Sequence, residues 1–227
     1  MAARRLVVFF GAPGVGKGTF AKIVCSKKGW KHFSLGDALR DQVAKRTELG
    51  LRVEEFMKAG RLVPDELANA ITLDYLVQHD KASGILLDGY PRTVGQAEKL
   101  LSSTKPSTIL ALNIKLEQRV CVEKLLAREE CTTCGRGFNS AHIVNDGYEM
   151  PALRPDPKTC PLGPTKCNPV LTTRNDDTKE TIERRFQEFH ERTSPVLDVL
   201  SKSGVLREFS VKRGVADADA LLAEIDR

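Results

Sequence analysis

The residues with the clearest chemistry form a glycine-rich stretch near the N-terminus, Gly11-Ala-Pro-Gly14-Val-Gly16-Lys17-Gly18-Thr19. This stretch follows a short apolar run and opens a segment with helical spacing. Glycine lets the backbone approach phosphate oxygens without interference from a side chain, and the N–H groups and dipole of a helix start attract an anion. The pattern therefore predicts a phosphate-binding loop. Its expected contacts come from Gly14, Val15, Gly16, Lys17, Gly18 and Thr19.

Two side chains of this loop add to what its backbone can bind. The amino group of Lys17 can reach the phosphates that are transferred, and the hydroxyl of Thr19 is placed near the metal-bound phosphates. In the general pattern a Ser or Thr follows the lysine directly, whereas Gly18 separates Lys17 from Thr19 here. A glycine-rich turn without a ligand is the alternative interpretation.

A carboxylate stands at the end of a second apolar run. Asp88 follows Gly84-Ile-Leu-Leu, which has the character of a short buried strand. A carboxylate at this place would bind Mg²⁺ through water or orient Thr19. A helix cap or a salt-bridge partner is the alternative role for Asp88.

The elements that must position these residues alternate between strand and helix. Strands are expected at residues 4–10, 32–34, 84–87, 107–114 and 205–209. Helices are expected at residues 17–28, 36–45, 48–58, 65–78, 94–101, 117–128, 176–200 and 216–225. Such alternation predicts an α/β fold with helices on both faces of a parallel sheet. Residues 131–173 have almost no helical period, and a coil of this length is typical of a functional lid or a metal-stapled insertion.

The composition limits the class of protein and of partner. Of the 227 residues, 41% are hydrophobic and 29% are charged, and no run of about 18 apolar residues is present to span a membrane. Because the first functional motif starts at Gly11, we expect no targeting segment before it, and we therefore expect a cytoplasmic protein. The net charge of +5 suits a polyanionic ligand such as a nucleotide. Because the basic residues are interleaved with acids, we expect no nucleic-acid surface.

Five segments, in order along the chain, resemble the adenylate kinase family of nucleoside monophosphate kinases. The first is the loop GAPGVGKGT itself. Residues 35–40 (LGDALR) are similar to the family's TGDxLR segment, and residues 60–66 (GRLVPDE) are similar to GKLVxDE. Residues 86–93 (LLDGYPRT), with Gln96, resemble LLDGFPRTxxQ, and residues 172–177 (TTRNDD), with Arg185, resemble TRxDDxxxTxxxR. Together these segments cover nearly the whole chain.

The resemblance implies both a fold and an activity. The fold would be a P-loop NTPase-like parallel sheet flanked by helices, with core residues 1–33, 64–126 and 178–227, an AMP-binding helical insertion at 34–63 and a lid at 127–177. The activity would be the reversible, Mg²⁺-dependent reaction ATP + AMP = 2 ADP, by direct in-line transfer without a covalent intermediate. The implied partners are small nucleotides (ATP or GTP, AMP and ADP), and the implied oligomeric state is a monomer.

The resemblance also assigns roles to residues at matching positions. Around the phosphates, the catalytic residues would be Lys17, Arg92, Arg128, Arg174 and Arg185. ATP would be bound, beyond the loop itself, by Lys124, Arg128 and Arg213, and Asp88 would act on Mg²⁺ through water. AMP would be bound by Leu35, Arg40, Arg61, Leu62, Val63, Gly89, Arg92, Gln96, Arg174 and Arg185, with Gln96 on the adenine. Arginine suits phosphate because its planar fork binds two oxygens at once and stays charged.

Three residues depart from the family pattern. Leu35 stands where Thr or Ser is usual, Phe20 where Gln is common, and Lys124 where an Arg usually packs on the base of the triphosphate. Lysine lacks the planar stacking surface of arginine, so GTP, or a broad range of donors, is an alternative to ATP. A third alternative is a P-loop binding module for RNA or a protein partner, against which the arginines at the matching positions argue.

Four of the six cysteines fall in the irregular stretch. Cys131-Thr-Thr-Cys134-Gly has the spacing of a zinc knuckle, and Cys160 and Cys167 would complete a four-sulfur site. Some lids of the family hold such a zinc with a second half spaced C-x₂-C or C-x₂-D, whereas six residues separate Cys160 from Cys167 here. A structural Zn²⁺ and a remnant knuckle of free thiols are both open interpretations. Four thiolates would leave the metal no open position for catalysis.

Overall fold

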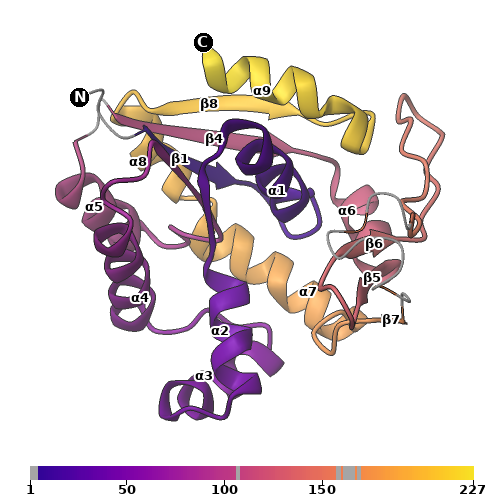
Figure 1. The fold of residues 1–227 in the computed structure, drawn as a ribbon, viewed down its shortest axis with the longest axis horizontal. Coiled ribbons are helices and arrows are strands. Elements are labelled where there is room, and N and C mark those ends of the chain that lie inside the picture. Colours follow the sequence, from indigo (N-terminus) through magenta and orange to yellow (C-terminus); the bar gives the residue numbers. More distant parts are fainter. Residues whose placement is uncertain (1–4, 106–107, 157–159, 161–166, 168–169) are drawn as a thin grey trace.

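The protein is built on a parallel sheet. The computed structural model describes residues 5–105, 108–156, 160, 167 and 170–227, which include a five-stranded sheet of order β2-β3-β1-β4-β8 (Figure 1). Its strands are β1 (Arg5–Phe10), β2 (Lys31–Ser34), β3 (Gly84–Asp88), β4 (Ile109–Lys115) and β8 (Leu206–Ser210). Each neighbouring pair is parallel, so the carboxyl ends of these strands lie at one edge of the sheet.

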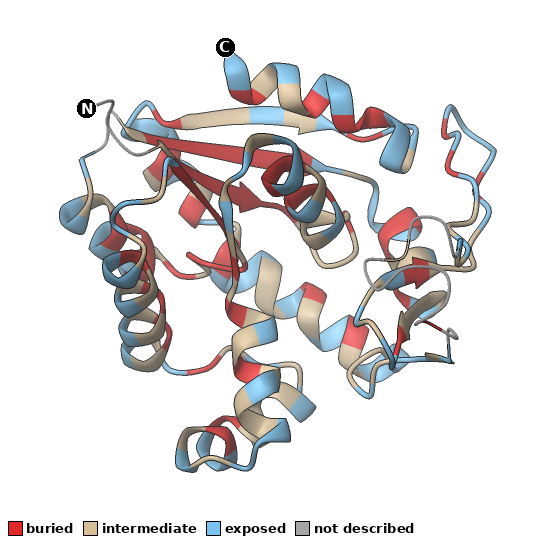
Figure 2. Cartoon of the chain, viewed as in Figure 1, coloured by how far each residue is buried: buried red, intermediate tan, exposed pale blue. Residues whose placement is uncertain are grey.

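Helices cover both faces of this sheet, as the sequence predicted. They are α1 (Lys17–Lys28), α2 (Leu35–Ala44), α3 (Glu48–Lys58), α4 (Asp65–Gln78), α5 (Val94–Ser103), α6 (Gln118–Leu126), α7 (Lys179–Glu188), α8 (Val196–Lys202) and α9 (Ala218–Asp226). In β1, Val7 and Phe9 belong to a core shared with α1, α6 and α9, whereas Leu6 and Val8 belong to a core shared with α4, α5 and α8. The central strands of the sheet are buried over most of their length (Figure 2). A strand buried on both sides appears as an unbroken apolar run in the sequence. Within the described part of the chain, no helix has the length and apolar character needed to cross a membrane.

The phosphate loop joins β1 to α1 at the carboxyl edge. Gly14 and Gly16 have φ angles of +88° and +101°, which residues with side chains rarely adopt. A Cβ atom on Gly14 would lie 2.5 Å from the carbonyl oxygen of Cys121. The loop therefore packs against α6 at a distance that only glycine permits.

A second, smaller sheet lies beyond α6, in a stretch that the sequence suggested to be irregular. It is antiparallel, with the order β6-β5-β7, and consists of β5 (Arg128–Cys131), β6 (Gly137–Asn139) and β7 (Leu171–Thr172). The helix predicted at 117–128 is wrong at its end, because α6 stops at Leu126. Strand formation here depends on partners far along the chain, which a local pattern does not contain. Residues 157–159, 161–166 and 168–169 of the same stretch lie outside the described residues.

The single helix predicted at 176–200 is also wrong. α7 begins only at Lys179, where the Thr178 hydroxyl caps the helix by accepting a hydrogen bond from the Thr181 N–H. A π-helical segment at Phe189–Thr193 and then Pro195 separate α7 from α8. Proline has no N–H with which to continue a helix, but it is tolerated at the start of one. The predicted ends of two strands, at residues 4 and 107, lie outside the described residues.

Candidate active site

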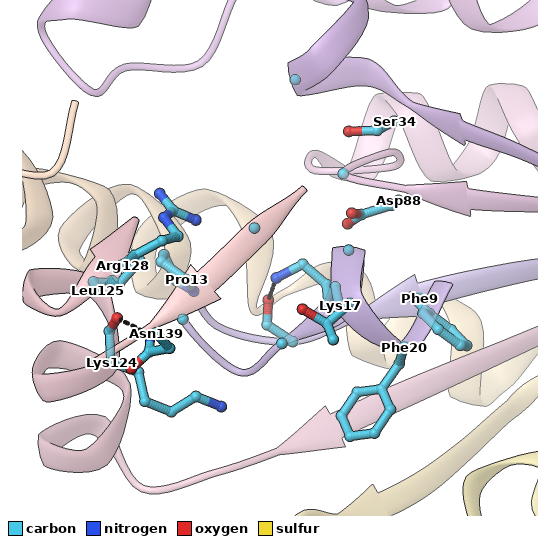
Figure 3. A pocket seen from close by; sticks show the side chains of 18 of the residues that line it. Phe9, Pro13, Lys17, Phe20, Ser34, Asp88, Lys124, Leu125, Arg128 and Asn139 are labelled. Carbon is cyan, nitrogen blue, oxygen red and sulfur yellow. Dashed lines mark hydrogen bonds between the residues drawn. The ribbon is translucent and has the colours of Figure 1, made fainter. Parts of the chain in front are cut away.

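A cavity of about 410 Å³ opens at the carboxyl edge of the parallel sheet (Figure 3). Ligands of open α/β sheets bind at this edge. The phosphate loop and the start of α1 contribute to the cavity wall, together with residues of the small sheet and of α7. Its charged lining residues are Lys17, Lys22, Asp37, Arg40, Asp88, Arg92, Lys124, Arg128, Arg136, Arg174, Arg185 and Glu188. The excess of cations suits a ligand with several phosphates.

Lys17 is held within the phosphate loop. Its ammonium group donates to the carbonyl oxygens of Gly11 and Ala12, at 2.7 and 2.9 Å (Figure 3). Burial lowers the pKa of Lys17 to about 8, although the negative charge of Asp88 acts in the opposite direction. An anion beside the ammonium group would favour its charged form.

Asp88, at the end of β3, lies beside the phosphate loop. Its Cα pairs in register with Phe9 of β1 and with Ser34 of β2. A Cβ atom on Gly18 would lie 3.2 Å from the Oδ2 atom of Asp88. A side chain in place of Gly18 would therefore lie against this carboxylate.

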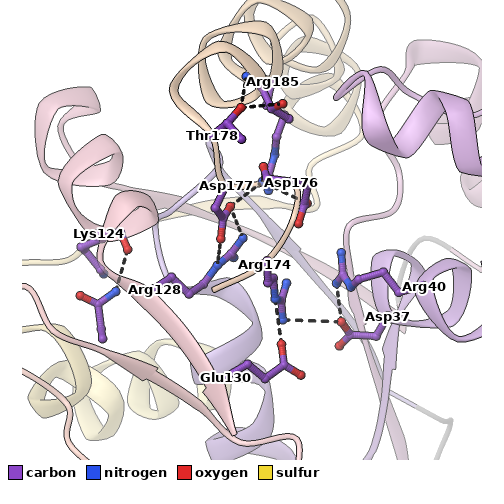
Figure 4. Close-up of polar contacts among 12 residues, drawn as sticks. Asp37, Arg40, Lys124, Arg128, Glu130, Arg174, Asp176, Asp177, Thr178 and Arg185 are labelled. Atoms are coloured by element: carbon purple, nitrogen blue, oxygen red, sulfur yellow. Dashed lines mark hydrogen bonds and ion pairs between the residues drawn. The ribbon is translucent and has the colours of Figure 1, made fainter. Parts of the chain in front are cut away.

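Two of the predicted arginines share one buried carboxylate (Figure 4). Arg128 donates through Nε and Nη2 to the two oxygens of Asp177, at 2.7 and 2.6 Å. Arg185 donates to Asp177 at 3.1 Å and to Asp176 at 3.3 Å. Burial lowers the pKa of Arg185 to about 10, while Asp176 acts to raise it. The Asp177 side chain is only 3% exposed, so it fixes both guanidinium groups at the cavity wall.

A second set of ion pairs joins the small sheet to α2 (Figure 4). Arg174 donates through Nε to Oε2 of Glu130 at 2.9 Å. Its Nη2 atom lies 4.0 Å from Oδ1 of Asp37, and Arg40 donates to the same oxygen of Asp37. Glu130 belongs to β5, Asp37 and Arg40 belong to α2, and Arg174 follows β7. Side chains from the small sheet, from α2 and from the segment after β7 thus meet at one group of charges.

A smaller cavity adjoins the first, towards α2 and α3. The predicted residues that line it are Leu35, Arg40, Arg61, Leu62, Val63, Arg92, Gln96 and Arg185, and four of these, Arg40, Leu62, Arg92 and Arg185, line the first cavity as well. Arg92 donates through Nε to the carbonyl oxygen of Gly89 at 2.9 Å, and burial lowers the pKa of Arg92. Gly89 and Arg174 line the first cavity. The residues predicted for AMP and those predicted for the triphosphate thus surround adjoining spaces.

Two predicted residues are not among those that line the cavities. Val15 is fully buried under the loop. Arg213 is exposed and pairs with Asp217 at 3.2 Å, although its neighbours Gly214 and Val215 line the first cavity. Lys124 does line it, and burial lowers the pKa of its amino group.

Sequence reasoning missed several residues that the structure places at this site. Asn139 lines the first cavity, and its side chain donates to the carbonyl oxygen of Lys124 at 2.7 Å (Figure 3). Asp37 and Asp177 stood inside the matched motifs but were not recognised as partners of arginines. Glu130 gave no signal, since a charged residue beside Cys131 is typical of a solvated surface.

The four cysteines of the irregular stretch gather against the small sheet. The sulfur atoms of Cys131, Cys134 and Cys167 lie within 4.8 Å of one another, and Cys160 packs against the same cluster. Burial acts against a thiolate at Cys131, but hydrogen bonds from the backbone of Cys134 and Thr133 lower its pKa to about 7. The uneven spacing of these cysteines along the chain therefore does not keep them apart in space.

The fold and the site together define a class of protein. Transfer of a phosphoryl group needs a cradle for the triphosphate, cations on the transferring oxygens and an acceptor held in line. A phosphate loop that faces several arginines across one cavity, with a second cavity beside it, meets these needs. The chain is a P-loop phosphotransferase.

Comparison with known proteins identifies the family. The adenylate kinase family model matches residues 9–205. The adenylate kinase of Thermotoga neapolitana is 38% identical over 223 residues, which cover 96% of this chain and 94% of that protein. The GTP:AMP phosphotransferase of Plasmodium falciparum is 34% identical, with 94% of this chain and 92% of that protein covered. The chloroplastic adenylate kinase 1 of Arabidopsis thaliana is 37% identical, with 96% of this chain and 76% of that protein covered. This chain belongs to the adenylate kinase family, which confirms the resemblance found in its motifs.

Proposed function

We propose that this protein catalyses ATP + AMP = 2 ADP, by direct in-line transfer of the γ-phosphoryl group. The observation that carries the proposal is the adjoining pair of cavities. The phosphate loop and Lys17 line the first, Leu35 and Gln96 line the second, and Arg40, Arg92 and Arg185 line both. A donor bound at the loop and an acceptor bound beside it would meet at these arginines.

Binding and orientation account for most of the proposed catalysis. Lys17, Arg128 and Arg185 would neutralise the charge that develops on the transferring oxygens. Arg40 and Arg92 would hold the phosphate of AMP. Asp177 and Glu130 would act on the arginines and not on the nucleotide. Asp177 binds Arg128 through both of its oxygens, and Glu130 accepts a hydrogen bond from Arg174. These contacts fix the guanidinium groups in place.

Magnesium fits this site through Asp88. A carboxylate beside the phosphate loop offers the oxygen ligands that Mg²⁺ prefers, and Thr19 lines the same cavity. Mg²⁺ commonly keeps several of its waters. When bound with the nucleotide, the ion would neutralise the charge of the phosphate oxygens. The closeness of Asp88 to Gly18 supports this placement.

Two segments would close over the nucleotides and exclude water. We assign residues 34–63 to the AMP side and residues 127–177 to a lid over the triphosphate. Both segments carry lining residues of the cavities. A Cβ atom on Gly60 would lie 3.1 Å from Thr181, so the first segment approaches the start of α7 closely. Exclusion of water would prevent the transfer of the phosphoryl group to water, which would waste the triphosphate.

GTP is the second candidate for the donor. Lys124 lines the first cavity where an arginine is usual, and an ammonium group offers a base no planar stacking surface. One of the relatives at 34% identity is a GTP:AMP phosphotransferase. We therefore expect Lys124 to make the donor site less selective between ATP and GTP.

The direct test is the initial rate of nucleoside diphosphate formation with Mg²⁺ and AMP, with ATP or GTP as the donor in parallel. Fast turnover with ATP supports the proposal. Fast turnover with GTP alone would keep the mechanism and change the donor. No turnover with either, in folded protein that binds nucleotide, would overturn the proposal in favour of a binding module.

We also propose that the four cysteines hold a structural Zn²⁺. The three clustered thiols, with Cys160 packed beside them, offer the sulfur ligands that tetrahedral zinc prefers. We expect protein purified without chelator to contain about one Zn²⁺ per chain, and Cys131→Ser to lose it while Cys25→Ser, outside the cluster, keeps it. Elemental analysis checks this, and a content under about 0.2 per chain would leave the interpretation of free thiols.

A further inference from the structure

The side-chain amide of Gln96 is held at both ends. Its Oε1 atom accepts a hydrogen bond from the backbone N–H of Arg92 at 2.7 Å, and its Nε2 atom donates to Oδ1 of Asp65 at 2.8 Å. The backbone N–H can only donate and a carboxylate can only accept. The two partners therefore allow one orientation of the amide, although the oxygen and nitrogen of a glutamine are otherwise easily exchanged. Gln96 is 2% exposed, so water does not compete for these bonds.

Asp65 is itself fixed by a neighbouring hydroxyl. Thr93 donates through Oγ1 to Oδ2 of Asp65 at 2.6 Å, and the same Oγ1 accepts from the N–H of Gln96 at 3.2 Å. Asp65 is the first residue of α4, and Thr93 caps α5. The starts of the two helices are thus joined through one carboxylate.

Tyr90 adds a second connection between the same helices. Its hydroxyl donates to Oδ1 of Asn69 in α4 at 2.7 Å and lies 3.2 Å from the carbonyl oxygen of Gln96 in α5. The Tyr90 side chain is 1% exposed. Backbone and side chain of Gln96 are therefore both positioned by residues outside its own helix.

The orientation of the amide decides which base it can recognise. Gln96 lines the smaller cavity, and its fixed bonds leave one Nε2 hydrogen and one Oε1 lone pair in a set order. Adenine presents an amino donor beside a ring acceptor, and guanine presents a carbonyl acceptor beside a ring donor. For a base held in one pose, the fixed amide matches one of these patterns and opposes the other. A site built to hydrogen-bond a substrate rejects analogues that leave buried polar groups unpaired.

We propose that Asp65 is a positioning residue that sets the specificity of the acceptor site for adenine over guanine, by fixing the amide of Gln96. The inference rests on the proposed function, in which Gln96 contacts the base of AMP. Asp65 itself touches Gln96 and Thr93 and acts through them, so its effect should appear in the choice of acceptor and in its Michaelis constant.

The test is Asp65→Asn, which keeps the shape of the side chain but can donate as well as accept. In this variant the side-chain amide of Gln96 can also bind with its oxygen and nitrogen exchanged. We expect the ratio of kcat/KM for AMP to that for GMP to fall at least about tenfold, mainly through a higher KM for AMP, with kcat for AMP within about threefold of the original protein. Asp65→Ala, which removes the acceptor, should lower the ratio in the same direction.

Glu66→Gln is the matched control. Glu66 is the next residue in the first turn of α4 and is exposed, so this change removes the same charge from the same helix end without touching Gln96. We expect it to leave the AMP-to-GMP ratio unchanged. In a Gln96→Ala background, Asp65→Asn should add nothing to the loss of discrimination, because the group it positions is gone.

The outcomes separate this inference from the proposed function. If the original protein phosphorylates AMP, and Asp65→Asn and Asp65→Ala keep its Tm and its AMP-to-GMP ratio, the role of Asp65 is overturned while the proposed function stands. An equal loss of ratio in Glu66→Gln would also overturn it, because the effect would then come from charge alone. If the original protein does not phosphorylate AMP, the proposed function fails and this inference fails with it.

Discussion

Lys17→Ala is expected to lower kcat for phosphoryl transfer at least about a hundredfold, which is the scale of losing one contact that stabilises charge in the transition state. The ammonium group is positioned by two carbonyl oxygens of the loop, at 2.7 and 2.9 Å. Burial lowers the pKa of Lys17 to about 8 against the opposite effect of Asp88, so a further anion beside the ammonium group would stabilise its charge. A transferring phosphoryl group would supply that anion, so the charge is best stabilised when phosphate is bound.

Lys27→Ala provides the control for this prediction. Lys27 lies on the same helix, is exposed, and pairs with Asp219 at the surface, and such pairs contribute little to stability. Steady-state rates with saturating ATP and AMP should leave kcat of Lys27→Ala within about twofold of the original protein. A kcat for Lys17→Ala within tenfold of the original value would contradict the role of Lys17.

Without the family resemblance, the residues themselves predicted the parts of the site that one continuous segment contains, whereas the arginines from separate segments were placed by the resemblance. The loop from Gly11 to Thr19 has its geometry fixed by neighbouring residues, so its motif and its place between β1 and α1 could be inferred together. Asp88 could be placed because the carboxyl ends of parallel strands meet at one edge. The structure adds that Gly18 lies against that carboxylate.

The parts that the sequence did not predict depend on partners far along the chain. Arg174, which follows β7, meets Glu130 of β5, 44 residues away along the chain, and neither these strands nor the pair has a local pattern. Asp65 and Gln96 are 31 residues apart, and their bond exists only because α4 and α5 begin side by side. The cysteines differ, because the knuckle spacing of Cys131 and Cys134 predicted their grouping with Cys160 and Cys167, although Cys167 stands 36 residues from Cys131 along the chain.

The second large effect is expected for Gly14→Ala. At Gly14 the φ angle is +88°, and a Cβ atom would lie 2.5 Å from the carbonyl oxygen of Cys121 and 3.0 Å from Cγ of Leu125. The nearest obstacle is backbone, which has no rotamer to change, so the loop itself must shift. A shift of about 1 Å in a phosphate-binding loop is enough to cost about a hundredfold in rate. We therefore expect kcat/KM for the donor to fall by about this factor, with a loss of about 2–3 kcal/mol in the free energy of unfolding.

Gly29→Ala separates the strain of the backbone angle from the collision at Gly14. Gly29 ends the same helix with a φ angle of +65°, and a Cβ atom there would meet nothing within 4 Å. Its alanine variant should lose only about 1 kcal/mol of unfolding free energy, the cost of a left-handed alanine, and should keep its kcat/KM. Chemical denaturation and steady-state kinetics of the two variants measure both quantities. Equal losses in the two variants would mean that the backbone angle alone matters and that α6 does not support the phosphate loop. A loss of kcat/KM confined to Gly14→Ala would show that the loop binds phosphate only in the position that its contact with α6 imposes.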